Sequence, residues 1–171
     1  MKTCRLLPIA VLFCGLAWSP AGAAEENESA AIARVLDDWH DAAAKADEAR
    51  YFAHFAPDGV FLGTDATERW DVAAFRAYAH PYFAKGKAWS FRPRARHVAV
   101  WNARTAWFDE LLDTPNLGEA RGSGVLVKEG GAWRIALYDL SVPIPNELAK
   151  EVVERIKEGP RPVASPAPAA K

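Results

Sequence analysis

A segment in which apolar and polar residues alternate, 121–146, constrains the fold of this chain more than any other. Alternation with a period of two is typical of a β-strand with one buried face. A turn over 129–131 divides the segment into two strands, and its two glycines can adopt the left-handed backbone conformation that a bulged hairpin requires. Pairing residues of equal parity sets Val127 opposite Trp133, whereas a shift by one residue would set it opposite Arg134. We therefore expect the first register.

The same register places charged residues in the sheet. Arg121 would lie opposite Asp139, and Asp109 would join the row if the preceding strand, 105–112, pairs with the hairpin in the corresponding way. A guanidinium between two carboxylates could hold an enolate while one aspartate acts as a base, so Asp109, Arg121 and Asp139 are the candidate catalytic residues. The alternative, which the sequence favours, is a charge cluster that only satisfies itself. Glu110 could replace Asp109, because a β-bulge would exchange their faces.

The first 23 residues have the layout of a secretory signal peptide. Lys2 and Arg5 precede an apolar run over 6–18, and small residues at 21–23 form a cleavage site. The run is shorter than the roughly 20 residues that a membrane-spanning helix needs. We therefore expect cleavage, a periplasmic or secreted mature chain, and no membrane span after cleavage.

Composition narrows what the mature chain can do. Both cysteines, Cys4 and Cys14, lie in the predicted signal, which excludes disulfides and thiolate catalysis after cleavage. Loss of Lys2 and Arg5 would leave 19 basic and 22 acidic residues and a formal net charge of −3. This mildly acidic balance is not typical of proteins that bind nucleic acid. Histidines and carboxylates do not recur at ligand spacing, so we expect no metal and no cofactor.

Helical periodicity dominates the first half of the mature chain, where a first helix follows the signal peptide. Asp47 can cap a second, shorter helix that ends at a turn over 57–59, and a short strand over 60–64 follows. Asp71 can cap a third helix, which Pro81 should kink or end early.

From Trp89 onward the period of the sequence becomes two, which predicts a long strand. His97 would lie on the apolar face of this strand and Arg96 on its solvated face. With the strand over 105–112 and the hairpin, it completes a four-stranded antiparallel meander. Asn146 can then cap a C-terminal helix.

Helices around a short strand, followed by a meander, make an α+β arrangement. The order of elements resembles a SnoaL-like domain of the nuclear transport factor 2-like superfamily. The residues that carry this resemblance are Val60-Phe-Leu-Gly-Thr-Asp65, Arg69-Trp70, Ala106-Trp-Phe-Asp-Glu110, Arg121-Gly-Ser-Gly-Val125, Trp133-Arg-Ile135 and Pro145-Asn146.

The resemblance covers roughly residues 29–158 and implies a cone. Three N-terminal helices would pack on a curved, mostly antiparallel sheet with an additional C-terminal helix, and a pocket would lie inside the cone. The resemblance also implies a homodimer through the outer face of the sheet. We expect three regions, a signal peptide over 1–23, a SnoaL-like domain over 24–158 and a disordered Pro/Ala-rich tail over 159–171.

Aromatic and polar residues inside such a cone could line a pocket for a small, largely apolar ligand. His97 could shuttle a proton there, although a hydrogen-bonded core histidine is the alternative. Asp65 could reach a ligand together with Arg69, or only cap a turn. The candidate pocket residues are Trp39, Tyr51, Phe55, Asp65, Trp70, His97 and Trp107.

Three functions stay open at this point. The leading hypothesis is an exported SnoaL-like protein that binds a small apolar molecule. Because the superfamily includes steroid isomerases and polyketide cyclases, the resemblance also allows an enzyme that moves a proton with an aspartate base. The third hypothesis is an interaction module that dimerises through the sheet.

Overall fold

A computed structural model describes residues 21–159 of the chain. The predicted signal peptide lies outside these residues except for its last three, and the predicted tail lies outside them from residue 160 onward. Within the described part, no helix is both long enough and apolar enough to cross a membrane.

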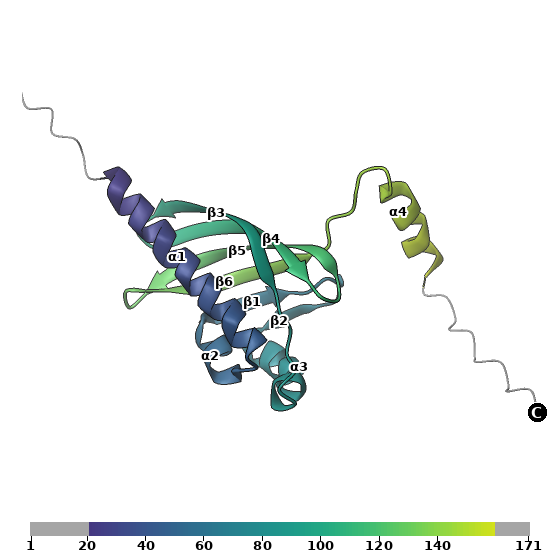
Figure 1. Cartoon of the computed structure of the whole chain (residues 1–171), viewed down its shortest axis with the longest axis horizontal. Helices are drawn as coiled ribbons and strands as arrows, with labels where there is room; N and C mark the ends of the chain where they lie inside the picture. The colour runs from purple at the N-terminus through teal and green to yellow at the C-terminus, as the bar shows by residue number, and fades with distance from the viewer. Residues whose placement is uncertain (1–20, 160–171) are drawn as a thin grey trace, which may run out of the picture.

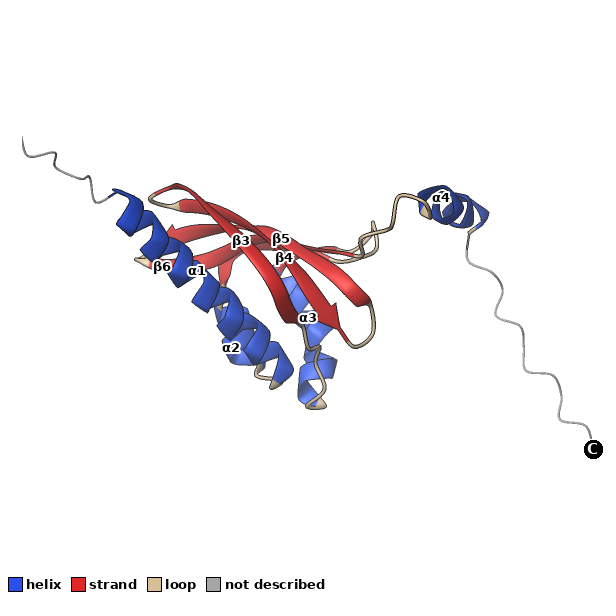
Figure 2. Cartoon of the chain, turned by 45° about the horizontal axis from the view of Figure 1, so that its top comes forward, coloured by secondary structure: helices blue, strands red, loops and turns tan. Residues whose placement is uncertain are grey.

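A curved six-stranded sheet wraps over three helices, as Figure 1 shows. The helices α1 (Ala21–Ala44), α2 (Glu48–Ala53) and α3 (Val72–Ala84) lie on the concave side of the sheet (Figure 2). Neighbouring strands are antiparallel except for β1 and β6, which run parallel, and the order across the sheet is β2-β1-β6-β5-β4-β3. The predicted α+β cone is therefore confirmed. The strands are β1 (Phe55–Leu62), β2 (Arg69–Asp71), β3 (Arg92–Asn102), β4 (Thr105–Thr114), β5 (Gly118–Glu129) and β6 (Ala132–Ser141).

Short polar side chains start two of the helices, as the sequence predicts. The Asp47 carboxylate accepts a hydrogen bond from the backbone N–H of Arg50 at 3.1 Å, and Asp71 accepts one from Ala74 at 2.8 Å. Each bond satisfies an N–H that has no partner within its helix. Pro81 lies inside α3, which continues to Ala84, so the predicted early end of this helix is wrong.

The predicted turn over 57–59 is also wrong, because these residues lie inside β1. The strand starts at Phe55, directly after α2, and its register against β6 shifts between Phe55 and Val60. A β-carbon at Gly59 would lie 2.9 Å from the carbonyl oxygen of Ile135. Only glycine allows the bulged strand to approach β6 this closely.

The core lies between α1 and the concave face of the sheet and is built from aromatic rings. Trp39, Tyr51 and Tyr138 are each fully buried. The ring of Trp39 lies 5.0 Å from that of Tyr51 and 4.6 Å from that of Tyr138, measured between centroids. Phe55 packs edge-on against Trp39 in the same cluster. Trp39, Tyr51 and Phe55, predicted as pocket residues, therefore form the core instead.

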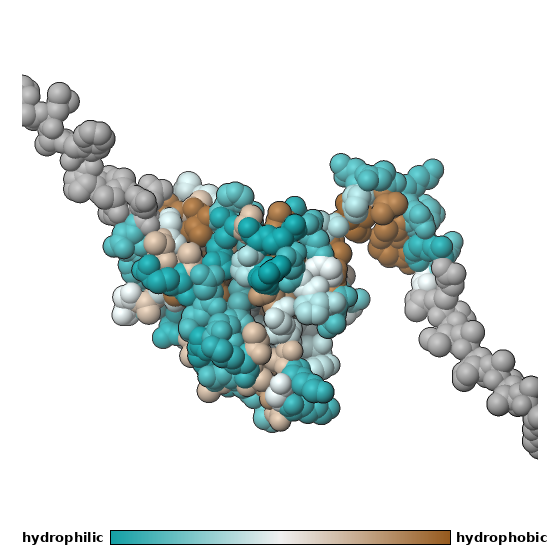
Figure 3. All heavy atoms as spheres, in the orientation of Figure 1, coloured by the Kyte–Doolittle hydropathy of each residue, from teal (hydrophilic) through white to brown (hydrophobic). Residues whose placement is uncertain are grey.

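The C-terminal helix α4 (Ala149–Glu158) stands apart from the cone (Figure 1). The predicted helix is confirmed, but it starts after Leu148 without a side-chain cap, so the predicted Asn146 cap is wrong. None of its residues is buried, and its apolar side chains gather on one side (Figure 3). Val153 and Ile156 are the large apolar residues that it exposes most.

Candidate functional site

The hairpin of β5 and β6 has a different register from the predicted one. Glu129 pairs with Ala132, so the turn contains only Gly130 and Gly131, both with positive φ (56° and 84°). Two-residue turns of this kind match the twist of the flanking strands. Val127 consequently lies opposite Arg134, the pairing that the sequence analysis rejected.

The new register separates the three predicted catalytic residues. Asp109 and Asp139 both lie opposite Ser123, one from each side, whereas Arg121 lies opposite Ser141. Asp109 and Arg121 are exposed, and all three residues alternate along their strands with buried residues, so they lie on the convex face of the sheet. The predicted guanidinium between two carboxylates is therefore wrong. A catalytic role for these residues stays a prediction, and such chemistry would have to occur on the convex face.

Glu110 points into the cone and is fully buried. His40 Nε2 lies 2.7 Å from one carboxylate oxygen, which also accepts a hydrogen bond from the Tyr138 hydroxyl at 3.3 Å. Arg96 Nε donates to the other oxygen at 2.8 Å, and its Nη1 reaches Asp37 at 2.7 Å. Burial opposes ionisation, but His40 and Arg96 outweigh it and hold the pKa of Glu110 below its ordinary value.

Arg92 and Arg94 at the start of β3 are exposed, as predicted, but from Ala95 onward the faces of the strand are the reverse of the predicted ones. Arg96 points inward to Glu110, whereas His97 is exposed on the convex face, where its Nδ1 lies 3.4 Å from an Asp109 oxygen. A register shift between Pro93 and Ala95 accompanies this change of face. Trp107 also lies on the convex face and is 46% exposed, so neither His97 nor Trp107 lines a pocket inside the cone.

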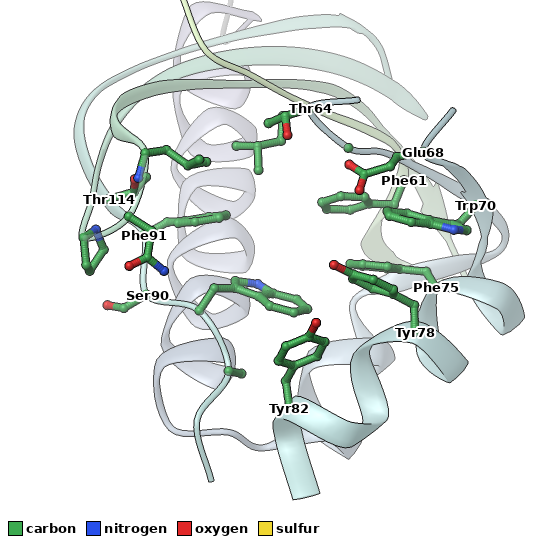
Figure 4. A pocket seen from close by; sticks show the side chains of 17 residues that line it. Phe61, Thr64, Glu68, Trp70, Phe75, Tyr78, Tyr82, Ser90, Phe91 and Thr114 are labelled. Carbon is green, nitrogen blue, oxygen red and sulfur yellow. The ribbon is translucent and has the colours of Figure 1, made fainter. Parts of the chain in front are cut away.

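A pocket of about 480 Å³ opens at one end of the cone, as Figure 4 shows. It lies between α3, the strands β1 and β2, the segment 88–91 before β3, and the loop that joins β4 to β5. Tyr78 and Tyr82 of α3 are nearly half exposed, so the pocket opens to solvent beside them. The aromatic residues that line it are Phe61, Trp70, Phe75, Tyr78, Tyr82, Trp89 and Phe91.

Five of these rings, those of Phe61, Trp70, Phe75, Tyr78 and Trp89, form a stacked group that borders the pocket. Trp70 stacks on Tyr78 with 4.7 Å between ring centroids, and Phe61 stacks on Phe75 at 4.0 Å. Phe75 also stacks on Trp89 at 5.8 Å. Rings packed in this way lose little additional freedom when a ligand covers them, so the wall is a preformed apolar surface.

One carboxylate, that of Glu68, lies among the described residues that line the pocket, and Figure 4 shows it turned toward the space between the rings. The backbone N–H of Asp65 donates to it at 3.2 Å. The side chain lies directly against Gly63, where a β-carbon would come within 2.8 Å of that of Glu68. Burial, together with Tyr82 and Glu68, raises the pKa of Tyr78, so this phenol is a neutral hydrogen-bond donor.

Of the predicted pocket residues, only Trp70 lines this pocket. Asp65 is exposed, and its carboxylate accepts hydrogen bonds from the N–H and the hydroxyl of Thr67, which lower its pKa. These bonds cap a turn, which is the alternative role that the sequence left open for Asp65. Glu68 was not among the predicted pocket residues. Its position three residues after Asp65, in the loop already singled out, was the available signal.

The described residues contain no group of side chains that could bind a metal ion. Among the side chains described, those of residues 27–159, no three from His, Cys, Asp or Glu come together in a way that could hold a metal ion.

Comparison with known proteins decides the family. The family described as the SnoaL-like domain matches residues 32–145. This chain belongs to that family. The match spans the SnoaL-like fold from α1 to the end of the sheet and includes every element that lines the pocket. Among curated proteins, none matches this SnoaL-like chain.

Solved structures share the nuclear transport factor 2-like fold of this SnoaL-like protein. One of unknown function from Pseudomonas putida is 19% identical, with a TM-score of 0.60 over 74% of this chain and 91% of its own. Another of unknown function, from Mycobacterium tuberculosis, is 18% identical, with a TM-score of 0.63 over 78% and 82%. A third, from Novosphingobium aromaticivorans and provisionally named a scytalone dehydratase, is 12% identical, with a TM-score of 0.61 over 72% and 89%. At these identities the likeness shows the fold alone.

Proposed function

We propose that this protein is an exported SnoaL-like protein that binds a small, flat, largely apolar molecule in the pocket beside α3. The observation that carries the proposal is the stacked aromatic wall, in which Trp70, Phe61 and Trp89 border a space of about 480 Å³. A pocket of this size suits a drug-sized molecule.

The free energy for binding would come from apolar burial. Each 100 Å² of apolar surface removed from water contributes roughly 2.5 kcal/mol. A flat ligand that lies against the rings buries one face on them without forcing them to reorganise. The hydroxyl groups of Thr64, Ser90 and Tyr78 at the edge of the pocket supply a few polar contacts that would orient the ligand.

Native mass spectrometry of protein purified from its own host tests this proposal. We expect a co-purified molecule on the wild-type protein, and its loss from a Trp70→Ala variant, because Trp70 supplies ring surface to the pocket. Ile156→Ala is the control, since Ile156 is 72% exposed on α4, which stands apart from the cone (Figure 1). Equal retention by both variants would contradict the proposal.

The pocket also favours a second candidate function, proton transfer of the isomerase or cyclase kind. A carboxylate and two phenols, from Glu68, Tyr78 and Tyr82, border the same apolar space. A carboxylate could remove a proton beside a carbonyl while a neutral phenol stabilises the developing oxyanion. Turnover of an enolisable ketone that Glu68→Gln abolishes and Asp139→Asn leaves unchanged would support this role, and absence of turnover would exclude it for that ketone.

Export and the domain boundaries form a separate part of the proposal. A signal peptide over 1–23 would leave a mature chain made of the folded domain over 24–158 and the Pro/Ala-rich tail over 159–171. The mass of the mature protein from a periplasmic extract tests this. An intact chain that begins at Met1 and stays in the cytoplasm would refute it.

A homodimer through the convex face is also part of the proposal. Trp101 and Trp107 expose large apolar rings there, 5.7 Å apart between centroids, and exposed aromatic clusters are typical of interfaces. Sedimentation at micromolar concentration should give the mass of a dimer that Trp101→Ala weakens. A monomeric mass would overturn this part.

A further inference from the structure

The pocket carries negative charge and no positive charge. Among the described residues that line it, Glu68 is the one carboxylate and none is Lys, Arg or His. The nearby Arg92 is engaged by Asp113 at 3.0 Å and does not line the pocket. A cleft with apolar walls and charge of one sign concentrates the field inside it. The pocket therefore disfavours an anionic ligand and attracts a cationic one.

The aromatic wall adds to this preference. The face of each ring carries the negative part of its quadrupole, so a desolvated cation over such a face is attracted to it electrostatically. Trp70, Tyr78, Tyr82 and Trp89 all border the pocket. Tryptophan and tyrosine are the side chains that bind cations best in this way.

Desolvation of Glu68 decides between a cationic and a neutral ligand. Its side chain is partly buried. In the described part of the chain, its carboxylate accepts one hydrogen bond, from the backbone N–H of Asp65. The carboxylate is turned toward the space between the rings, as Figure 4 shows. A neutral apolar ligand would strip water from this charge without replacing it, which is costly, whereas a cation compensates the charge directly.

The carboxylate is also held in place before a ligand arrives. The backbone N–H of Glu68 donates to the Asp65 carbonyl at 2.9 Å, and the Gly63 N–H donates to the Glu68 carbonyl at 2.8 Å. These bonds close the loop between β1 and β2 on itself. Binding a cation therefore requires little ordering of the loop.

From these observations we propose that the ligand is an organic cation, a methylated ammonium group on a flat apolar body, with the charge between Glu68 and the aromatic rings. The inference rests on the proposed binding function of the pocket and specifies its ligand class. A primary ammonium has three N–H donors to satisfy, and one carboxylate beside ring faces satisfies them poorly. A methylated ammonium has few or none, so it suits this pocket better.

Three probes of similar shape and different charge test the inference. Phenyltrimethylammonium is the cation, tert-butylbenzene is its neutral isostere, and 4-tert-butylbenzoate is an anion of the same type. Binding to the full mature chain can be measured by titration of tryptophan fluorescence, because Trp70 and Trp89 line the pocket. We expect the cation to bind at least tenfold more tightly than the neutral probe, and the anion to bind most weakly.

Charge-neutral variants then identify the group responsible. Glu68→Gln should weaken binding of the cation about tenfold and leave the neutral probe unchanged or slightly tighter. Glu129→Gln is the matched control, because Glu129 is exposed at the opposite end of β5 from the pocket. It should leave all three affinities unchanged.

The outcomes separate this inference from the proposed function. If the neutral probe binds as tightly as the cation, or if Glu68→Gln does not weaken the cation, the cation inference is overturned while the apolar pocket stands. If the anion binds most tightly, the inference is likewise overturned. If no probe binds to the folded protein, both the ligand class and the pocket proposal fail.

Discussion

Two carboxylates on the concave side of the sheet are held in opposite ways. Glu110 is fully buried, and His40, Arg96 and Tyr138 bond to its oxygens. Glu68 is partly buried at the pocket, with one backbone amide as the hydrogen-bond partner of its carboxylate in the described chain. A buried carboxylate whose oxygens all have hydrogen-bond partners is typical of a structural role. A carboxylate in an apolar pocket that can still accept hydrogen bonds is typical of a ligand-binding role. Under the proposed function, burial alone ranks these two residues in the wrong order.

The largest expected effect is on stability, from loss of Glu110. Glu110→Ala leaves Arg96 and His40 buried without their anion, which should destabilise the fold by roughly 3–5 kcal/mol. Urea denaturation measures the difference. Asp109→Ala, one residue earlier on the exposed face of β4, should change stability by less than about 0.5 kcal/mol. Equal effects of the two substitutions would show that the buried cluster is not structural.

The pH dependence of stability sharpens the same comparison. The pKa of folded Glu110 lies below its ordinary value of 4.5, so its contribution is complete above that pH and is lost as the pH falls through the folded value. We expect the wild-type protein to lose stability to urea as the pH falls below 4.5, and Glu110→Gln to lack this component of the loss.

His54 also contributes to the pH dependence of stability, at higher pH, because burial lowers its pKa. This contribution is the same in the wild type and in Glu110→Gln, so it cancels in the difference between their pH curves. Parallel pH curves for the wild type and Glu110→Gln would contradict the prediction.

Gly63→Ala tests how the pocket carboxylate is positioned. The new β-carbon would collide with the Glu68 side chain, whose own β-carbon would lie only 2.8 Å away. We expect a loss of about 1 kcal/mol of stability, since the loop can shift, together with weaker binding of phenyltrimethylammonium. Thermal unfolding and the fluorescence titration measure the two effects. Unchanged binding would mean that the position of Glu68 does not matter.

The smallest stability effect should come from Glu68 itself. Its carboxylate has no cation partner within residues 21–159, so Glu68→Gln should change the free energy of unfolding by less than about 0.5 kcal/mol. The same substitution is expected to reduce cation binding, so function and stability would separate at this residue. A loss of stability similar to that of Glu110→Ala would remove the distinction between the two carboxylates.

The architecture could be predicted from sequence because local signals agree with it. The Asp47 and Asp71 caps and the alternation of the strands place most elements correctly. The faces of the strands could not be predicted where the pairing is irregular. A shift between Val125 and Leu126, opposite β6, and another near Pro93 in β3 change the parity of the residues that follow.

The site was harder to predict than the fold. Arg96 belongs to a series of alternating arginines, a pattern typical of a solvent-exposed strand face. It points inward because it pairs with the buried Glu110 of another strand, which the local sequence does not indicate. Glu68 gave no periodic signal, because a loop places it. Trp70 was found because an aromatic ring in a polar loop stands out against its neighbours.

The parallel pairing of β1 with β6 has a consequence for folding time. The meander from β3 to β6 forms through hairpins between neighbouring segments, whereas β1 must find the last strand of the sheet, where Phe61 pairs with Tyr138. Contacts between distant parts of a chain are slow to form. Both of these strands contribute to the lining of the pocket, β1 with Phe61 and β6 with Leu140. A chain still emerging from the ribosome therefore has no pocket, and a ligand can stabilise only the completed fold.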